Sequence, residues 1–377
     1  MPPTDQPGVN YRKRIRVLIV DDSAVVRRII MSTLLRHPDM EVIGTSANGL
    51  EAIADIKKIR PDVVTLDIEM PKMDGITALK EIRQFDRSLP IIMFSTLTQR
   101  GAESTIEALT CGASDYVGKP SNMADQTEAL KVLEDALIPK IRALCNKTAS
   151  PVKRPAAARI EATAVGSPLP ATAPVPPAAL AVRNPERVEA LCIGVSTGGP
   201  AALMQLFSAW TAPLPIPVFI VQHMPPKFTE LLSARLTTIG VMQVREAVDG
   251  EEAIAGRVYM APGGRHLELS KSGTKVMLSL NENPAENSCR PAVDVLFRTA
   301  ARIYGRRLLA VVLTGMGSDG LKGAEKIVEA GGRVLAQDEE TSVIWGMPGA
   351  VVNAKLAESV LPLDQIPNEI LLRLQRR

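Results

Sequence analysis

The chain has 377 residues, which is enough for two or three domains that each bury a core of their own. Its composition, 46% hydrophobic and 23% charged with a formal net charge of +3, disfavours both extensive disorder and electrostatic capture of nucleic acid. No apolar run approaches the roughly 20 residues that span a bilayer, and the N-terminus lacks the apolar centre of a signal peptide, so we expect a cytoplasmic protein without membrane insertion. The four cysteines are scattered without a C-x-x-C spacing, which indicates free thiols rather than disulfides or a zinc site.

The first predicted unit, residues 12–145, alternates strand-like and helix-like segments. Its strands are expected at Ile15 to Val20, Met40 to Thr45, Asp62 to Leu66, Pro90 to Phe94 and Asp115 to Val117. Its helices are expected at Ala24 to Leu35, Leu50 to Lys58, Gly75 to Phe85, Ala102 to Leu109 and Gln126 to Leu144. Strict alternation of this kind predicts a parallel sheet with helices on both faces.

Polar residues follow these strands at their carboxyl ends, which meet at one edge of a parallel sheet. The residues are Asp21 and Asp22 after the first strand, Asp67 after the third, Ser95 after the fourth, and Lys119 with Pro120 after the fifth. Clustered carboxylates need a hard cation between them, and oxygen ligands suit Mg²⁺. Asp67 is placed to accept a phosphoryl group, whose oxygens Lys119 would neutralise and the Ser95 hydroxyl would contact. Helix capping explains any one of these residues, but not all of them at successive strand ends.

This unit resembles the receiver domain of two-component response regulators from about Ile15 to Leu144. The matching residues are Asp21-Asp22, Asp67 within L-D-I-E-M-P, Asp74-Gly75, Ser95 and Lys119-Pro120. The resemblance implies phosphoryl transfer from a histidine kinase to Asp67, with Mg²⁺ held by Asp22, Asp67 and the backbone carbonyl of Glu69, assisted by Asp21. It also implies that Tyr116 is an aromatic switch residue, the alternative being a simple surface aromatic.

Residues 146–187 are dominated by proline and alanine without an apolar period, and Pro174, Pro176 and Pro177 cluster within them. Such a segment buries too little surface to fold, and its prolines keep it extended. We therefore predict a flexible linker between two globular units. A long loop inside one domain is the alternative, which the usual lengths of loops disfavour.

The second predicted unit, residues 188–377, is a further doubly wound α/β structure with a parallel sheet. Its strands are expected at Ala190 to Val195, Val218 to Gln222, Arg257 to Ala261, Leu309 to Leu313 and Arg333 to Gln337. Its helices are expected at Ala201 to Trp210, Thr229 to Thr237, Ala292 to Tyr304 and Leu321 to Ala330. Alternating runs at His266 to Ser270 and Lys275 to Leu280 predict a small antiparallel insert between Gln243 and Leu280.

Ser196 follows the first strand of this unit, between Gly194 and Gly198, in the G-x-S-x-G spacing. Glycines on both sides permit a sharp turn and the close approach of a substrate, as a nucleophilic serine requires. A glycine-rich turn that binds phosphate at a helix N-terminus, or that only packs a helix on a sheet, is the alternative. The choice depends on whether a base and an acid lie nearby.

A serine nucleophile needs a base within hydrogen-bond reach and a third group to orient that base. His223 ends the next strand, and His266 in A-P-G-G-R-H is the second candidate, whereas His37 lies in the other unit. Asp319 is the carboxylate of the glycine-rich loop after Leu309 to Leu313, although it also fits as a helix N-cap. Backbone N–H groups of that loop, Met316 first, are candidates to stabilise an oxyanion. The chain order Ser, His, Asp argues against the α/β-hydrolase fold.

The second unit resembles the catalytic domain of the CheB family of chemotaxis protein-glutamate methylesterases. The matching motifs are G-V-S-T-G-G-P, V-Q-H-M-P, A-P-G-G-R-H, R-P-A-V-D-V-L-F, L-T-G-M-G-S-D-G and W-G-M-P-G-A-V. The resemblance implies that Ser196 is the nucleophile, His223 the base and Asp319 the orienting acid. It further implies an oxyanion and substrate pocket that includes Thr197, Met316, His266 and Arg290. Two features depart from the family: Cys289 stands where a histidine is frequent, and the linker is long.

The implied reaction is hydrolysis of glutamate γ-methyl esters on methyl-accepting chemotaxis receptors, through an acyl-enzyme and without a cofactor in the esterase site. Deamidation of receptor glutamines is the expected second activity, because esters and amides share a tetrahedral oxyanion. The implied partners are these receptors and, as phosphoryl donor, a histidine kinase of the CheA type, with recruitment to receptor clusters. We expect the unphosphorylated receiver to cover the Ser196 edge. A DNA-binding output and a non-catalytic scaffold are the rival classes.

Overall fold

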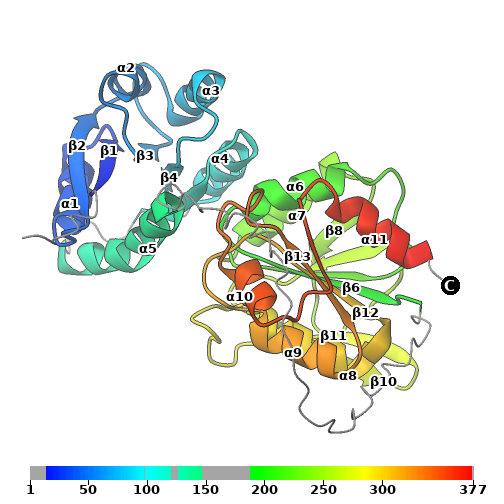
Figure 1. Cartoon of the computed structure of the whole chain (residues 1–377). Coiled ribbons are helices and arrows are strands. Elements are labelled where there is room, and N and C mark those ends of the chain that lie inside the picture. The colour runs from blue at the N-terminus through cyan, green and yellow to red at the C-terminus, as the bar shows by residue number, and fades with distance from the viewer. Residues whose placement is uncertain (1–13, 97, 120–125, 147–186, 376–377) are drawn as a thin grey trace, which may run out of the picture.

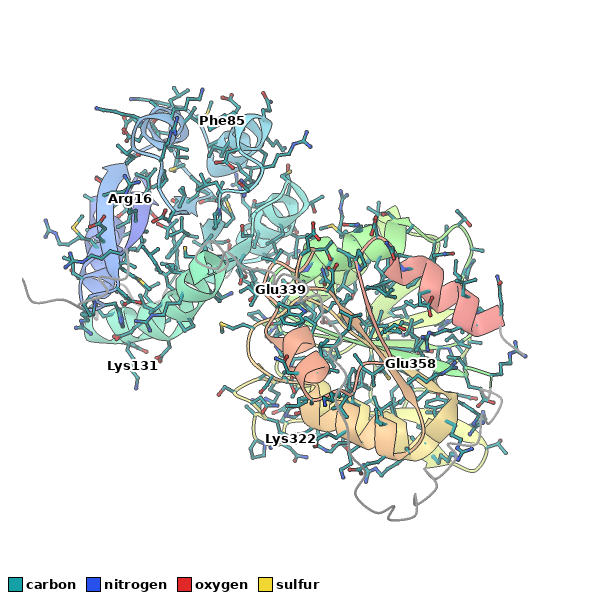
Figure 2. All side chains as sticks on the ribbon, in the orientation of Figure 1. Arg16, Phe85, Lys131, Lys322, Glu339 and Glu358 are labelled. Atoms are coloured by element: carbon teal, nitrogen blue, oxygen red, sulfur yellow. The ribbon has the colours of Figure 1, made fainter. Side chains whose placement is uncertain are left out.

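The computed structural model describes residues 14–96, 98–119, 126–146 and 187–375, which form two α/β units (Figure 1). The predicted linker, apart from its two end residues, lies outside these ranges. Side chains fill the space between each sheet and the helices that cover it (Figure 2). Among the helices in the described ranges, none combines the length and the apolar character needed to cross a membrane.

The N-terminal unit has the predicted five-stranded parallel sheet, and its strands lie in the order β2-β1-β3-β4-β5. Its strands are β1 Ile15–Val20, β2 Met40–Ser46, β3 Val63–Asp67, β4 Ile91–Ser95 and β5 Asp115–Gly118. Helices α1 Ala24–Leu34 and α5 Gln126–Asn146 cover one face. Helices α2 Gly49–Ile59, α3 Gly75–Phe85 and α4 Gln99–Thr110 cover the other. The strand order reverses between β1 and β3, the position where such sheets bind ligands.

Side-chain caps fix where four of these helices begin. Ser23, Asn48, Asp74 and Thr98 accept hydrogen bonds from backbone N–H groups in the first turns of α1, α2, α3 and α4. Gly75 directly follows Asp74, the cap of α3. It lies so close to β3 that a Cβ there would come within 1.9 Å of the Asp67 carbonyl oxygen. The Asp74-Gly75 pair therefore lets α3 start against the backbone of Asp67.

The C-terminal unit has a seven-stranded sheet in the order β14-β13-β12-β6-β7-β9-β8, with every neighbouring pair parallel. Its strands are β6 Ala190–Val195, β7 Val218–Gln222, β8 Gln243–Glu246, β9 Arg257–Met260, β12 Leu308–Val312, β13 Arg333–Gln337 and β14 Ser359–Leu361. The short edge strands β8 and β14 were not predicted. The antiparallel insert is confirmed as the hairpin β10 His266–Ser272 and β11 Lys275–Asn281. It is shorter than expected, because β8 at the start of the expected insert joins the parallel sheet beside the predicted strand β9.

Two layers of helices enclose this sheet. Helices α6 Gly199–Ser208, α7 Phe228–Ile239 and α11 Ile366–Gln375 share one apolar cluster with it. Helices α8 Val293–Tyr304, α9 Leu321–Glu329 and α10 Met347–Asn353 share another, together with the hairpin. The strand order reverses between β6 and β12, so the loops after these strands flank the expected ligand position.

The two units contact each other through α4 of the first and α6 and α7 of the second (Figure 1). Apolar side chains of Ile106 and Leu109 belong to the same buried cluster as Met204 and Phe228 across this contact. The Thr110 hydroxyl lies 3.3 Å from the sulfur of Met204. The contact is therefore formed mainly by packed apolar groups, whose burial stabilises the association of the two units.

Candidate active site

Ser196 lies in a tight turn between β6 and α6. Its backbone N–H donates to the Thr314 carbonyl at 3.0 Å, and its own carbonyl accepts from the Gln222 side-chain amide at 3.0 Å. Gly198 has φ +78°, and a Cβ there would lie 2.5 Å from the Cβ of Val343. A Cβ at Gly194 would lie 2.4 Å from a methyl group of Val293. Both glycines of the G-x-S-x-G spacing are therefore required by the backbone, independently of any chemistry.

The structure brings together His223, which directly follows β7, and Asp319 in the loop after β12, the strands on either side of β6. His223 Nε2 lies 2.7 Å from Asp319 Oδ2; the Asp319 side chain is buried and that of His223 is 11% exposed. Asp319 also accepts from the backbone N–H groups of Val293 at 2.6 Å and Asp294 at 3.1 Å. These amides open α8, whose N-cap residue Ala292 has no side-chain bond to offer. Asp319 thus caps a helix distant in sequence, and the positive helix end stabilises its charge.

The same contacts set the pKa values of the pair. Burial acts to raise the pKa of Asp319, but hydrogen bonds from His223, Val293 and Asp294 outweigh it and hold the pKa below the usual value. Burial acts to lower the pKa of His223, whereas its hydrogen bonds to Asp319 and Cys289 raise it to about 9. An ionised carboxylate beside an imidazole of raised basicity is the arrangement that stabilises an imidazolium during proton transfer.

The other ring nitrogen of His223, Nδ1, lies 3.5 Å from the Cys289 sulfur. Ser196 and His223 line one small cavity of about 30 Å³, whose wall includes Tyr116 and Lys140 of the first unit. Within the described part of the chain, no hydrogen bond joins the Ser196 hydroxyl to His223. The predicted nucleophile and the predicted base therefore line the same cavity without a hydrogen bond between their side chains.

The predicted oxyanion residues lie beside Ser196. A Cβ at Gly315 would come within 2.9 Å of the Ser196 Cβ, so the backbone that leads into Met316 packs against the serine. Among the described residues, the backbone N–H groups of Thr197 and Met316 donate to no protein acceptor. The Thr197 carbonyl is fixed by the Thr314 hydroxyl at 2.9 Å. Two unused donors therefore flank the nucleophile.

The two predicted pocket residues His266 and Arg290 are not brought to this cavity. His266 is buried, with Nε2 3.1 Å from the Pro284 carbonyl and Nδ1 accepting from the Ala292 N–H at 3.2 Å. Arg290 donates to the backbone carbonyls of Glu282 and Asn283 at 2.7 and 3.2 Å. Both side chains fix loops around the hairpin, and neither lines the cavity of Ser196 and His223.

A second polar site lies at the carboxyl edge of the N-terminal sheet. The Lys119 ammonium is 2.8 Å from Asp67 and 3.0 Å from Asp21, and both carboxylates are buried. Burial and the neighbouring Asp21 raise the pKa of Asp67 to about 6, against the opposing effect of Lys119. Carboxylate oxygens of Asp21, Asp22 and Asp67 lie within 4.8 Å of one another. An all-oxygen cluster of this kind fits Mg²⁺.

A cavity of about 200 Å³ opens beside this cluster, lined in part by Asp22, Asp67, Glu69, Ser95 and Lys119. The Ser95 hydroxyl donates to the carbonyl of Gly101 at 2.9 Å, so it lies at the rim without contacting Asp67. The Glu69 side chain is exposed toward Arg100. The predicted phosphorylation residues thus share one cavity of a size that accommodates a phosphoryl group.

Tyr116 is not a simple surface aromatic. Its ring stacks on that of Phe228 at the start of α7, with centroids 4.9 Å apart and planes inclined by 11°. Lys140 of α5 lies over the same ring at 5.2 Å and bonds to Asp115 at 2.8 Å. The predicted switch residue is therefore a direct contact between the unit of Asp67 and the unit of Ser196.

Sequence patterns did not identify Asn287, which contacts Asp319, or Gln222, which holds the Ser196 carbonyl. Gln222 had a detectable signal, because a polar residue ends an otherwise apolar strand immediately before His223. Asn287 had none, since it lies in an irregular loop far from Asp319 in sequence.

The N-terminal unit carries an acidic site of the receiver type. The C-terminal unit carries a His–Asp pair beside a serine that is flanked by glycines. Together these two features define a response regulator with an enzymatic output. Family models agree: residues 17–131 match the response regulator receiver domain and residues 191–370 match CheB methylesterase. The chain therefore belongs to the CheB methylesterase family.

Relatives match nearly the whole chain. It is 45% identical over 361 residues to a protein-glutamate methylesterase/protein-glutamine glutaminase of Trichodesmium erythraeum (strain IMS101), covering 96% of this chain and 99% of that protein. A protein of the same description from Nocardioides sp. (strain ATCC BAA-499 / JS614) is 49% identical over 364 residues, covering 96% of each. The crystal structure of the Thermotoga maritima CheB methylesterase catalytic domain is 44% identical, covering 49% of this chain and 98% of that one, with a TM-score of 0.48.

Proposed function

We propose that this chain is a phosphorylation-regulated hydrolase that removes methyl groups from glutamate γ-methyl esters of methyl-accepting chemoreceptors during adaptation in chemotaxis. Relatives named protein-glutamate methylesterase/protein-glutamine glutaminase support both this activity and deamidation of specific receptor glutamines. The observation that carries the proposal is the buried hydrogen bond between His223 and Asp319, at the ends of the two strands that flank the strand of Ser196. We assign residues 12–145 to the receiver, 146–187 to the linker and 188–377 to the methylesterase.

The geometry supports a specific proton path. Because Nε2 of His223 is held by Asp319, Nδ1 is the nitrogen that takes the proton from the Ser196 hydroxyl as its oxygen attacks the ester carbonyl. The negative oxygen that forms is stabilised by the backbone N–H groups of Thr197 and Met316. The intermediate then collapses, and the leaving methoxide takes the proton from His223 to become methanol.

Water resolves the acyl-enzyme by the same groups in reverse. His223 takes a proton from the attacking water, the bond between carbonyl carbon and Ser196 oxygen breaks, and the serine recovers its proton. The products are a free glutamate carboxylate and active enzyme, with no cofactor in the esterase site. With a glutamine substrate the first step releases ammonia in place of methanol, and the second step is unchanged.

The receiver site supplies the regulation. We assign phosphoryl transfer from a histidine kinase of the CheA type to Asp67, with Lys119 and Ser95 contacting the transferred group. Asp22, Asp67 and the Glu69 carbonyl would hold Mg²⁺, with Asp21 in support, and the bound cation would neutralise charge that develops on the phosphoryl oxygens. Recruitment of the chain to receptor clusters would place both sites beside their partners.

The contact between the units supports an inhibitory role for the unphosphorylated receiver. Leu109, Tyr116 and Lys140 form one wall of the cavity in which Ser196 and His223 lie. A receptor helix cannot reach the serine while this wall is in place. Phosphorylation of Asp67 must then favour the separated state, with Tyr116 linking the two sites.

Release of methanol from methylated receptor membranes tests the enzymatic proposal. The Ser196→Ala variant should release none, whereas Ser208→Ala, which removes an exposed hydroxyl from α6, should match the unchanged protein. Substantial release by Ser196→Ala would assign the reaction to another nucleophile. Absence of release from the unchanged, phosphorylated protein would favour a non-catalytic scaffold.

A further inference from the structure

A two-residue turn lies against the His223–Asp319 pair. Glu286 and Cys289 exchange backbone hydrogen bonds of 3.1 and 2.8 Å, and the residues between them, Asn287 and Ser288, have φ of +51° and +62°. Two successive positive φ values are the signature of the tightest hairpin turns, and asparagine tolerates this conformation better than most residues. The turn therefore has a fixed shape that directs its side chains.

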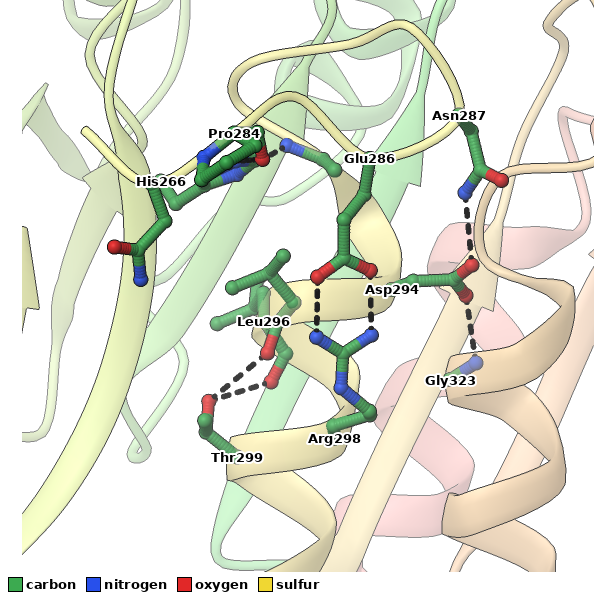
Figure 3. A network of polar contacts seen from close by, with 12 residues as sticks. His266, Pro284, Glu286, Asn287, Asp294, Leu296, Arg298, Thr299 and Gly323 are labelled. Atoms are coloured by element: carbon green, nitrogen blue, oxygen red, sulfur yellow. Dashed lines mark hydrogen bonds and ion pairs between the residues drawn. The ribbon is translucent and has the colours of Figure 1, made fainter. Parts of the chain in front are cut away.

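The side chain of Asn287 connects two buried carboxylates. Its Nδ2 lies 2.9 Å from Asp319 Oδ1 and 2.9 Å from Asp294 Oδ2, the second contact being visible in Figure 3. A primary amide has two hydrogens, so it can donate one to each carboxylate. Asp294 and Asp319 are both almost fully buried, so the loss of a hydrogen-bond donor to either carboxylate is costly.

The two carboxylates oppose each other electrostatically. Burial raises the pKa of Asp294 and the charge of Asp319 adds to this effect, whereas hydrogen bonds from Gly323 and Asn287 act in the opposite direction. The backbone N–H of Asp294 also donates to Asp319 Oδ1. Asn287 is thus the side-chain donor that the two acids share, and it offsets their repulsion at the point where they approach.

The turn is anchored to α8, the helix that Asp319 caps. The Glu286 carboxylate forms two hydrogen bonds, of 2.6 and 2.7 Å, with the Arg298 guanidinium on α8 (Figure 3). This paired geometry fixes orientation as well as distance. Because α8 also supplies the amides that hold Asp319, the turn and the triad acid are positioned by the same rigid element.

We propose that Asn287 is a positioning residue for hydrolysis: its side-chain amide ties the Asp319 carboxylate to Asp294 and so holds Asp319 in the orientation that accepts from His223. This inference rests on the proposed roles of Ser196, His223 and Asp319. Loss of the amide leaves Oδ1 of Asp319 with only the backbone N–H groups of Asp294 and Gly320 as donors, and it removes the side-chain link to Asp294 that restrains the carboxylate against turning away from the imidazole. The expected consequence is a slower chemical step without weaker substrate binding.

The test compares Asn287→Gly with Ser288→Gly in the full chain. Glycine suits the positive φ at both positions, so both variants keep the turn, but only Asn287→Gly removes the amide. We expect Asn287→Gly to lower kcat for methanol release roughly ten- to hundredfold with KM unchanged, by analogy with loss of a hydrogen bond to a buried charged group. Ser288→Gly should leave both constants unchanged. Equal kcat values for the two variants would overturn the proposal.

An NMR measurement on His223 separates a positioning role of Asn287 from a merely structural role in the turn. The chain has three histidines, so the imidazole N–H resonance of His223 is resolvable after ¹⁵N-histidine labelling. Asn287→Gly should shift or broaden that resonance and leave those of His37 and His266 in place. An unmoved His223 resonance beside a reduced kcat would overturn the proposal. Should the glycine variant fail to fold, Asn287→Asp, equally suited to the left-handed backbone, replaces the donor by an acceptor and should show the same loss.

The Ser196→Ala variant separates failure of the proposed triad from failure of the proposed role of Asn287. If that variant still releases methanol, the assigned roles of the triad fail, and the role of Asn287 fails with them. If Ser196→Ala is inactive while Asn287→Gly matches Ser288→Gly, the triad stands and the positioning role alone is overturned.

Discussion

The two ring nitrogens of His223 have different partners, and in the proposed mechanism this difference decides which of them serves Ser196. Nε2 bonds to Asp319, while Nδ1 lies 3.5 Å from the Cys289 sulfur and is the nitrogen that we propose receives the serine proton. A base must be unprotonated to act, and the contacts of His223 raise its pKa to about 9. With His223 as the proposed base, we therefore expect activity at neutral pH to be limited by the small fraction of neutral imidazole.

Replacing Cys289 should lower the pKa of His223 and so increase the fraction of neutral imidazole. Cys289→Ala removes one of the contacts that raise the pKa of His223, so the neutral fraction at pH 7 increases and kcat/KM rises, about tenfold for each unit by which the pKa falls. In the unchanged protein kcat/KM should climb with pH toward about 9, and in the variant the inflection should lie at lower pH. Cys145→Ala, which removes a thiol from α5 of the receiver, is the control. Superimposable pH profiles would contradict the assigned influence of Cys289.

Removing the charge of Asp319, the proposed orienting acid, should lower the rate of hydrolysis. Asp319→Asn keeps the shape of the side chain but removes the charge that stabilises the imidazolium, so kcat should fall by roughly 10³ to 10⁴. The same change weakens the cap of α8 and should lower the melting temperature. Parallel thermal denaturation and methanol-release measurements check both effects. A variant with more than a tenth of the original kcat would exclude Asp319 from the triad.

Among the elements, the turn between β6 and α6 is the one on which the position of the nucleophile depends. Gly198→Ala would force an alanine to φ +78° and into Val343, whereas Gly250→Ala meets the same backbone strain at φ +74° with no heavy atom within 4 Å. We expect Gly250→Ala to cost about 1 kcal/mol of unfolding free energy and Gly198→Ala about 2 to 4 kcal/mol. Denaturant titration measures both costs. Equal costs would mean that the turn relaxes, and kcat should then be retained.

Elements with long apolar runs could be predicted from the sequence to within a few residues, and this accuracy explains why the candidate site residues could be placed at strand ends. Ser196, His223 and Asp319 follow three such strands, and parallel strands bring their carboxyl ends together. The short strands β8 and β14 escaped prediction because four and three residues at a sheet edge carry no apolar period. The contacts of Asn287 with Asp319 and of Cys289 with His223 were not predicted, because the direction of side chains in a turn depends on backbone angles that tertiary contacts determine.

At the scale of the whole molecule, the receiver holds the proposed phosphorylation site and also contributes Tyr116 and Lys140 to the wall of the cavity that Ser196 lines. The stacked rings of Tyr116 and Phe228 belong to different domains, and no local pattern in either domain predicts that they meet. An aromatic pair contributes about 0.5 to 1.5 kcal/mol beyond its buried area. This energy is comparable to the bias that a regulatory equilibrium requires.

Weakening the contact between Tyr116 and Phe228 should raise the rate of methanol release by the unphosphorylated protein. Phe228→Leu keeps an apolar side chain in the core but loses the stacking, and Tyr116→Ala removes the receiver ring, so each should raise the basal rate of methanol release about two- to tenfold. The phosphorylated rate should change less, because the contact is already open. A basal rate that falls or stays constant in both variants would show that this contact does not restrain the enzyme.

The central claim, that phosphorylation of Asp67 controls hydrolysis at Ser196, is tested most directly by one measurement. The initial rate of methanol release from methylated receptor membranes is compared with and without the phosphorylating kinase, for the full chain and for Asp67→Asn. Asp135→Asn, an equal change of charge at an exposed position of α5, is the control. The account predicts that the kinase accelerates release by the unchanged chain and by Asp135→Asn but not by Asp67→Asn. Equal acceleration of all three, or of none, would contradict it.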